Sequence, residues 1–290
     1  MDLVMKANTS KHLYCALLLI TCGAVGASAA RLAYEGFDYP PLSTLNGSAG
    51  GFGFTPASWI ADTGILVQPP PGLSTLLGLP STGLCVGGGF YGFRQLANPL
   101  NQSEYWVSFM IHANPGNDMV YLGLDTLPAT IPSISFGRLL NSCFIRQGNT
   151  TLGQVPYPWI AGSTDLLVAR IQQLALFTQV DLWVNPSAFS PPPPPILSVA
   201  AACPAYTWVN LQVQPGFLAD EIRIGTTPGD VAGVTLGGSV TGGNLTLTWS
   251  HGTLLQAPTP NGPWQTNSAA ASPYTVPINS PQQFYRVIVQ

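Results

Sequence analysis

Short runs of alternating apolar and polar residues dominate the middle of this chain. The clearest run is 105–112, in which Tyr105, Val107, Phe109 and Ile111 share one face. Comparable runs occupy residues 120–124, 134–138, 143–146, 166–171, 180–184, 208–213 and 218–225. Glycine, proline and asparagine separate these runs, and no long segment repeats every 3.6 residues. The pattern predicts an all-β protein built as an antiparallel two-sheet sandwich with little helix.

Residues 1–30 have the pattern of an export signal. Lys6 and Lys11 precede an apolar stretch at 13–25, and the small residues at 27–30 offer a cleavage site. A membrane-anchoring helix and a lipoprotein signal at Cys22 are the alternatives, but glycines interrupt the stretch and the residue before Cys22 fits a lipoprotein signal poorly. We therefore predict an exported protein (periplasmic, at the cell surface or extracellular) with no transmembrane span after cleavage.

The character of the sequence changes after residue 229. Residues 234–243 are rich in glycine, threonine and serine, which is typical of a linker, and 244–290 contain several short apolar runs. The predicted organisation is a signal peptide at 1–30, a sandwich at 31–233, a linker at 234–243 and a small β module at 244–290.

Five consecutive prolines at 191–195 favour a stiff, extended polyproline segment. Such a run often marks a domain boundary. We interpret it instead as a loop between two strands, because 208–225 continues the strand pattern that precedes the prolines.

Charged residues are scarce, at 7% of the 290 residues, against roughly 25% in an ordinary soluble protein. Beyond residue 30 the chain has no lysine, and its 7 arginines and 11 carboxylates leave a net charge of −4. Nucleic-acid binding requires a basic surface that neutralises phosphates, so no nucleic-acid partner is expected.

Three cysteines remain beyond the predicted signal peptide: Cys85, Cys143 and Cys203. An exported protein can form disulfides, so one disulfide with a free thiol and three unpaired buried cysteines both fit the sequence. No C-x-x-C spacing is present, which argues against a structural zinc site.

Several segments, in their order along the chain, resemble one group of domains. They are the opening strand at 33–39, the Pro-Pro-Gly-Leu turn within 66–79, and the segments 87–96, 182–186 and 220–225. Together, over residues 31–232, they resemble exported bacterial domains of the concanavalin A-like (laminin G-like) jelly-roll superfamily. The remainder resembles a small C-terminal module common on exported bacterial proteins.

The resemblance implies a jelly roll of two stacked antiparallel sheets, one of them concave. The superfamily includes sugar-binding lectins, glucanases, polysaccharide lyases and adhesion modules, so the fold alone does not select a function.

The residue patterns of the common hydrolytic sites are missing. There is no Gly-x-Ser-x-Gly motif, and His112 and His251 fall in different predicted domains. Glucanases of the superfamily that this chain resembles carry Glu-x-Asp-x-Glu on one strand, a pattern absent here. Asp220 and Glu221 are adjacent, so we expect them on opposite faces of a strand, where they cannot form a catalytic carboxylate pair. No catalytic residue is predicted.

Tryptophans give the strongest indication of a binding site. Trp106, Trp183 and Trp208 each lie on the face opposite the aliphatic residues of their strand. If the three strands share the concave sheet, the indoles form a stacking platform for sugar rings, with Asn210 and Gln212 as hydrogen-bonding neighbours. The alternative is that the indoles pack beneath loops, because most tryptophans are largely buried.

The resemblance also implies calcium as the one metal to consider, since some laminin G-like domains hold Ca²⁺ at the sheet rim. The candidate ligands are Asp118, Asp125, Asp165 and Asp181, and Asp118, in a Gly-Asn-Asp loop, is the preferred one. Its carboxylate suits a hard cation and suits a turn equally well. No other cofactor is expected.

Residues 220–225 concentrate three charges in a charge-poor chain. The resemblance places this segment as the closing strand, beside the first strand of the domain. We predict that Glu35 and Asp38 face Arg223 there and join the two ends of the domain by a charge-assisted contact.

These observations favour a non-catalytic exported protein that binds a polysaccharide or a cell-surface glycan. Two alternatives stay open. One is a polysaccharide-active enzyme of the same fold, a glycoside hydrolase or lyase. The other is a structural protein of the cell envelope, because a surface with few charges suits packed arrays.

Overall fold

The computed structural model describes residues 31–70, 72–73, 84–113, 119–186, 192–202, 204–232, 236–249, 253–259, 262–277 and 283–288. Within these ranges the chain is almost entirely β-structure. Every strand pair among them is antiparallel. The predicted antiparallel two-sheet jelly roll, followed by a small β module, is confirmed.

One layer of the sandwich, sheet A, has eight strands. They are β1 (Arg31–Glu35), β3 (Leu66–Val67), β4 (Val86–Gly87), β6 (Glu104–Ala113), β11 (Thr164–Gln173), β12 (Thr178–Val184), β13 (Leu197–Ala201) and β15 (Phe217–Gly225). Their order is β13-β12-β11-β6-β15-β4-β3, and β1 also pairs with β15.

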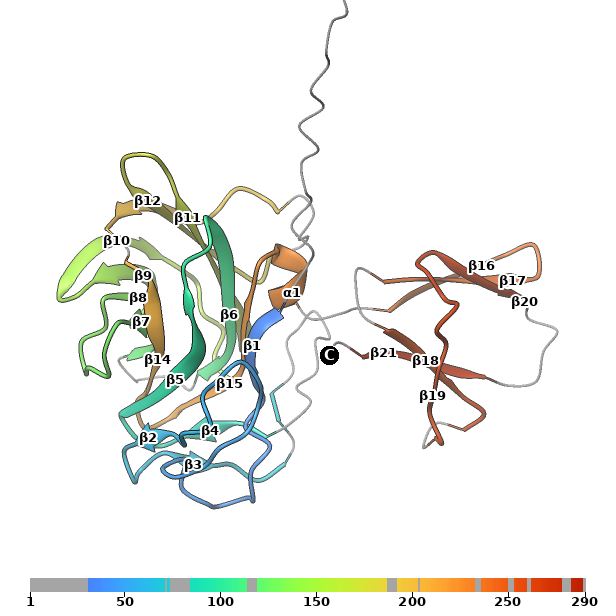
Figure 1. Ribbon diagram of the computed structural model, residues 1–290, viewed down its shortest axis with the longest axis horizontal. Helices are drawn as coiled ribbons and strands as arrows, with labels where there is room; N and C mark the ends of the chain where they lie inside the picture. The colour runs from blue at the N-terminus through green and yellow to red at the C-terminus, as the bar shows by residue number, and fades with distance from the viewer. Residues whose placement is uncertain are drawn as a thin grey trace, which may run out of the picture.

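The other layer, sheet B, has seven strands and stacks on sheet A (Figure 1). They are β2 (Ile60–Ala61), β5 (Tyr91–Leu100), β7 (Met119–Asp125), β8 (Ile134–Leu139), β9 (Ser142–Gln147), β10 (Thr150–Pro156) and β14 (Tyr206–Val213). Their order is β10-β9-β8-β7-β14-β5-β2, so β14 lies between β7 and β5.

The helix α1 (Pro228–Ala232) follows β15 and packs on the face of sheet A that points away from sheet B. Ser108 of β6 fixes it there by donating a 2.7 Å hydrogen bond to the carbonyl of Val231. Within the described ranges, no helix has the length and apolarity needed to cross a membrane.

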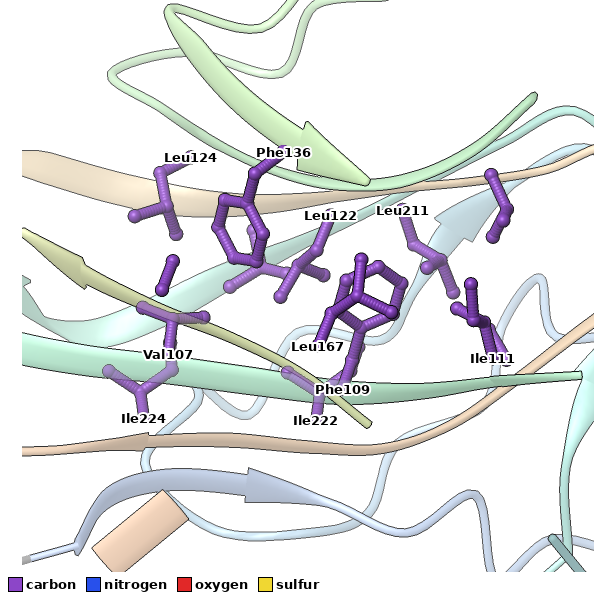
Figure 2. Packing of buried hydrophobic residues seen from close by; sticks show 14 of the residues in the cluster. Val107, Phe109, Ile111, Leu122, Leu124, Phe136, Leu167, Leu211, Ile222 and Ile224 are labelled. Atoms are coloured by element: carbon purple, nitrogen blue, oxygen red, sulfur yellow. The ribbon is translucent and has the colours of Figure 1, made fainter. Parts of the chain in front are cut away.

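The core fills the space between the two sheets, as the alternation predicts. Figure 2 shows apolar side chains of both sheets pointing toward one another, among them Val107, Phe109 and Ile222 from sheet A and Leu122 and Leu211 from sheet B. All five are fully buried. Each such side chain contributes about 1.5–3 kcal/mol relative to an exposed one.

The proline run connects two paired strands. β12 pairs directly with β13, with Leu182 opposite Leu197, and the prolines lie between them in the chain. Of the run, 192–195 fall within the described ranges, and the carbonyl of Pro193 accepts a 2.7 Å hydrogen bond from the Trp183 indole. The interpretation of the prolines as a loop between strands is confirmed.

The first and last strands of the sandwich pair as expected, with Tyr34 opposite Arg223. The predicted charge contact between them is wrong, however. Arg223 forms its ion pair with Glu221 of its own strand, whereas Glu35 pairs with Arg94 of β5 at 2.9 Å. The third predicted member, Asp38, is exposed.

A β-bulge explains why Arg223 pairs within its own strand. The register shifts between Asp220 and Arg223, and Glu221 has the left-handed φ of 55°. The expectation that Asp220 and Glu221 point to opposite faces is therefore wrong. Asp220 accepts a hydrogen bond from the Leu73 amide, and Glu221 accepts bonds from Arg223 and the Tyr34 hydroxyl.

The C-terminal module consists of two three-stranded sheets. The first contains β16 (Gly237–Thr241), β17 (Asn244–Thr248) and β20 (Tyr274–Pro277), and the second contains β18 (Thr253–Ala257), β19 (Gln265–Thr266) and β21 (Phe284–Ile288). Leu247, Trp249 and Leu254 form its core. Residues 237–241 of the predicted linker are thus a strand, because β17 offers them a complete antiparallel partner.

Cys85 and Cys143 are both buried and unpaired, while Cys203 lies outside the described residues. Burial, together with the charge of Asp220, raises the pKa of the Cys85 thiol to about 12. Burial and the charge of Asp165 raise the pKa of Cys143 to about 12 as well. Both thiols therefore stay protonated and unreactive at neutral pH.

We accordingly expect iodoacetamide at pH 8 to spare Cys85 and Cys143 in the folded protein and to modify both in urea, as read by peptide mass spectrometry. The pKa of a thiol in an unfolded chain is about 8.5. Between that value and the folded pKa of about 12, only the unfolded chain loses the protons, so stability falls as pH rises through this window. Rapid alkylation of either thiol in the native state would contradict the burial.

Candidate functional site

Trp106 and Trp183 lie on the outer face of sheet A, and neither is open to a ligand. They are 2% and 4% exposed, with their rings stacked 5.3 Å apart. The Trp106 indole donates to the Glu104 carboxylate at 3.0 Å, and the Trp183 indole donates to the proline loop. Met110, Val168 and Val231 pack in the same buried cluster. Trp106 and Trp183 therefore hold α1 and the proline loop against the outer face of sheet A.

Trp208, by contrast, belongs to β14 of sheet B. The premise that all three tryptophans share one sheet is wrong, because chain order does not reveal which strands pair. The two predicted amides do accompany Trp208: Asn210 and Gln212 project from the same face of β14. Their neighbours Val209 and Leu211 point into the core, which confirms the alternation of this strand.

The strands beside β14 complete a face rich in aromatic and amide groups. Trp208 is opposite Gln95 and Asp125, Asn210 is opposite Phe93, and Gln212 is opposite Tyr91 and Tyr121. Directly opposed residues of an antiparallel pair share a face. We call this surface the polar–aromatic face; its members are Tyr91, Phe93, Gln95, Tyr121, Asp125, Trp208, Asn210 and Gln212.

Three of its aromatic rings are half-buried rather than covered: Tyr91, Phe93 and Trp208. The Tyr91 and Phe93 rings are almost parallel, at 8°, with centroids 6.4 Å apart. Phe90, 46% exposed, extends the aromatic surface beside Tyr91. Flat apolar surface of this kind packs favourably against another flat apolar group.

The residues beside these rings on the same face carry buried oxygen acceptors. Asn210 Oδ1, Gln212 Oε1 and Asp125 Oδ2 are all buried without a hydrogen-bond donor among the described residues. The other Asp125 oxygen is in use, accepting from the Thr126 amide at 2.8 Å and the Ser133 hydroxyl at 2.7 Å. An unfilled buried acceptor costs roughly 1–3 kcal/mol, so this face favours a partner that brings donors.

The loop between β7 and β8 borders the face and holds its polar groups in place. The Asn210 amide nitrogen donates to the carbonyl of Ala129, and the Tyr121 hydroxyl donates to that of Thr130 at 3.2 Å. Gly123 allows this approach, since a Cβ there would lie 2.7 Å from the Pro132 ring. The free Asn210 oxygen is thereby fixed in orientation.

Tyr121 stays neutral at physiological pH. Burial, and then the neighbouring Tyr91, raise the pKa of its phenol above the ordinary value. Its hydroxyl therefore remains a hydrogen-bond donor to the loop. The face presents Asp125 as the single carboxylate on the described strands of sheet B.

An open depression of about 640 Å³ lies elsewhere, at the β11–β12 hairpin. Leu174, Leu176 and Phe177 line it. Its polar groups Gln173 and Thr178 bond each other at 2.8 Å. It offers apolar contact without the unfilled acceptors of the polar–aromatic face.

The calcium site at Asp118 stays a prediction. Asp118 lies outside the described residues. Among those that are described, no three His, Cys, Asp or Glu side chains gather closely enough to hold a metal ion.

Sequence reasoning placed Trp208, Asn210 and Gln212 on one strand face, as the structure does, but it did not bring Tyr91, Phe93 or Tyr121 to that face, and it considered Asp125 only as a calcium ligand. The signal for Tyr91 and Phe93 was present, since residues 91–96 alternate between rings and smaller or buried groups. Nothing local in the sequence indicates that this strand adjoins β14, which lies more than a hundred residues later.

No protein-family model matches this chain, and no curated protein matches it either. Solved structures give distant matches. The exoplasmic/lumenal domain of VIP36 in its metal-free form is 7% identical, with a TM-score of 0.38 over 68% of this chain and 92% of that one. Domain 4 of AbnA, a GH43 extracellular arabinanase from Geobacillus stearothermophilus in complex with arabinotriose, is 17% identical, with a TM-score of 0.38 over 70% and 97%.

The carbohydrate binding module CBM66 from Bacillus subtilis is 8% identical, with a TM-score of 0.33 over 55% of this chain and 91% of that one. TM-scores this low do not assign a fold by themselves. The fold is assigned from the strand order and strand pairing described above.

Proposed function

We propose that the protein binds carbohydrate without transforming it, through the polar–aromatic face of sheet B. The observation that carries this proposal is the combination of half-buried parallel rings with buried acceptors that have no donors. A sugar ring presents both complements at once: a flat C–H surface for the aromatic groups and hydroxyl donors around its rim.

The acceptors favour a neutral sugar over an acidic one. Asn210 and Gln212 supply uncharged oxygens, and the third acceptor is the Asp125 carboxylate. A uronate or sulfate placed beside Asp125 would meet a like charge in a partly desolvated site. Hydroxyl groups would instead donate to whichever of the three oxygens the ligand reaches when the side chains around it shift, because all three are buried in the unbound structure.

The shortage of carboxylates supports a binding role over hydrolysis. A glycosidase needs two carboxyl groups, about 5–5.5 Å apart when the mechanism retains configuration. The described strands of sheet B carry Asp125 alone. Export, expected from residues 1–30, would bring this face to extracellular or cell-wall polysaccharide.

The test is a glycan array of neutral and uronate-containing oligosaccharides, followed by calorimetry with the best neutral binder. We expect the double variant Tyr91→Ala with Phe93→Ala to weaken binding ~10-fold or more, a loss of about 1.4 kcal/mol. Gln212→Met, which keeps the shape but removes the acceptor, should weaken binding several-fold through the lost hydrogen bond.

Phe177→Ala is the matched control, because it removes a half-exposed ring from the β11–β12 hairpin, away from this face. It should bind as the unaltered protein does. The proposal fails if no neutral glycan binds, or if the Tyr91/Phe93 variant remains folded and binds equally well.

A further inference from the structure

The surface of this protein carries very little charge, and the C-terminal module carries least of all. Residues 231–290 contain one charged side chain, Arg286. Elsewhere ten charged residues are buried: Glu35, Arg94, Asp125, Arg138, Asp165, Asp181, Asp220, Glu221, Arg223 and Asp230. Electrostatic repulsion between two copies of the module is therefore almost absent, and low net charge promotes association.

The strand β16 forms an unprotected edge in this module. It ends the β16-β17-β20 sheet and pairs with β17 alone among the described strands. Its register has no bulge, and its sequence, Gly-Gly-Ser-Val-Thr, contains neither proline nor charge. Natural sheets usually protect an exposed edge with lysine, proline or a bulge, because free backbone groups invite another strand.

The apolar core of the module does not cover Val240 on this edge strand. It lies opposite Leu245, on the face of the sheet that carries the core residue Leu247, yet it is 64% exposed. Gly238 lies on the same face, and a Cβ built there would have only ordinary contacts, the nearest at 3.5 Å. The edge thus presents a large side chain and a vacant position two residues apart.

We propose that this module forms a two-fold dimer in which β16 pairs antiparallel with β16 of a second copy, centred on Ser239. In that register Val240 of each copy lies opposite Gly238 of the other, so each valine fills the space above the partner's glycine. Gly237 lies opposite Thr241 in the same way. The two sheets become one continuous sheet, and both exposed valines are covered.

A second copy is the partner that this edge fits. A closed two-fold interface must be self-complementary, and the Gly238–Val240 spacing provides that complementarity with itself. A charged partner would find no complementary charge within residues 237–241. The inference is independent of the carbohydrate site, which lies on sheet B of the sandwich.

The test measures the association state of the chain beginning at Arg31 by sedimentation velocity over a wide concentration range. We expect a reversible dimer. Val240→Lys places two like charges at the new interface and should raise the dimer dissociation constant ~10-fold or more, about 1.4 kcal/mol. Ser268→Lys adds the same charge at an exposed loop of the module and should leave the dimer intact.

Cysteine cross-linking tests the register separately. Ser239→Cys residues would face each other at a Cα separation of about 4.5–5.5 Å, within disulfide range. Mild oxidation should join them. Two Thr241→Cys residues would lie four positions out of register, ~13 Å apart, and should not join. A monomer at all concentrations, a dimer unaffected by Val240→Lys, or equal cross-linking of both cysteine variants would overturn the proposal.

Discussion

Replacement of Glu35 by alanine is expected to destabilise the sandwich by about 3–5 kcal/mol, because it leaves the Arg94 guanidinium buried without its counter-ion. Glu35 is 1% exposed and accepts four hydrogen bonds. The donors are the Phe37 amide at 2.9 Å, the Tyr39 hydroxyl at 2.7 Å, the Trp59 indole at 3.0 Å and Arg94 at 2.9 Å. One side chain thus holds the first strand, the following loop and β5 together.

The measurement is equilibrium unfolding in urea, followed by tryptophan fluorescence. For a domain of this size, the loss corresponds to a fall in Tm of roughly 10 °C. Glu35→Gln should lose most of the same stability. The new amide nitrogen is a hydrogen-bond donor, and the four groups that surround it are donors too, three of them on side chains.

The double variant Glu35→Leu with Arg94→Met separates pairing from packing. It removes both charges and keeps an apolar filling, so it should be more stable than Glu35→Ala. An exposed ion pair contributes at most about 1 kcal/mol. If Glu35→Ala lost less stability than that, Glu35 would not be holding β1, the following loop and β5 together.

The alternation of apolar residues predicts most of the long strands, their buried faces and the two-sheet architecture, but not β10 or β13. It placed Val209 and Leu211 in the core and Asn210 and Gln212 on the opposite face, as the structure shows. This success has a local cause, because successive side chains of a strand point to opposite faces wherever the strand lies.

The errors arose where the answer depended on distant parts of the chain. Glu35 was assigned to Arg223 because first and last strands are neighbours, but its partner Arg94 comes from the other sheet, 59 residues away in sequence. The bulge at Glu221 reverses the expected direction of a carboxylate, and no residue pattern marks it. The covering of Trp106 and Trp183 by α1 and the proline loop is equally non-local.

The scarcity of charge also has a different meaning in the folded protein. From the sequence, it suggested a surface maintained by uncharged polar groups. In the structure, most of the few charges are inside, and the pairs Glu35–Arg94, Asp181–Arg170 and Glu221–Arg223 join elements of the sandwich or brace a bulge. The exterior is consequently nearly neutral, which suits both a neutral sugar ligand and contact between identical copies.

The tryptophans of the two sheets should respond to mutation in opposite ways. Trp106→Ala removes a fully buried indole that stacks on Trp183, and should destabilise the sandwich by about 3–5 kcal/mol. Trp208→Ala removes a half-buried indole at the edge of the polar–aromatic face, so its stability cost should be smaller. Its glycan affinity should instead fall several-fold through the lost stacking surface.

The two effects are separated by measuring urea unfolding and calorimetric binding for each variant at a temperature where near-ultraviolet circular dichroism shows folded protein. Trp106→Phe, which retains a ring against Trp183, should recover part of the stability and bind normally. If Trp106→Ala abolishes binding while folded, or Trp208→Ala binds unchanged, the ligand does not use sheet B. Trp208 is the tryptophan on which the carbohydrate proposal depends, because it alone of the three shares a face with the unfilled acceptors.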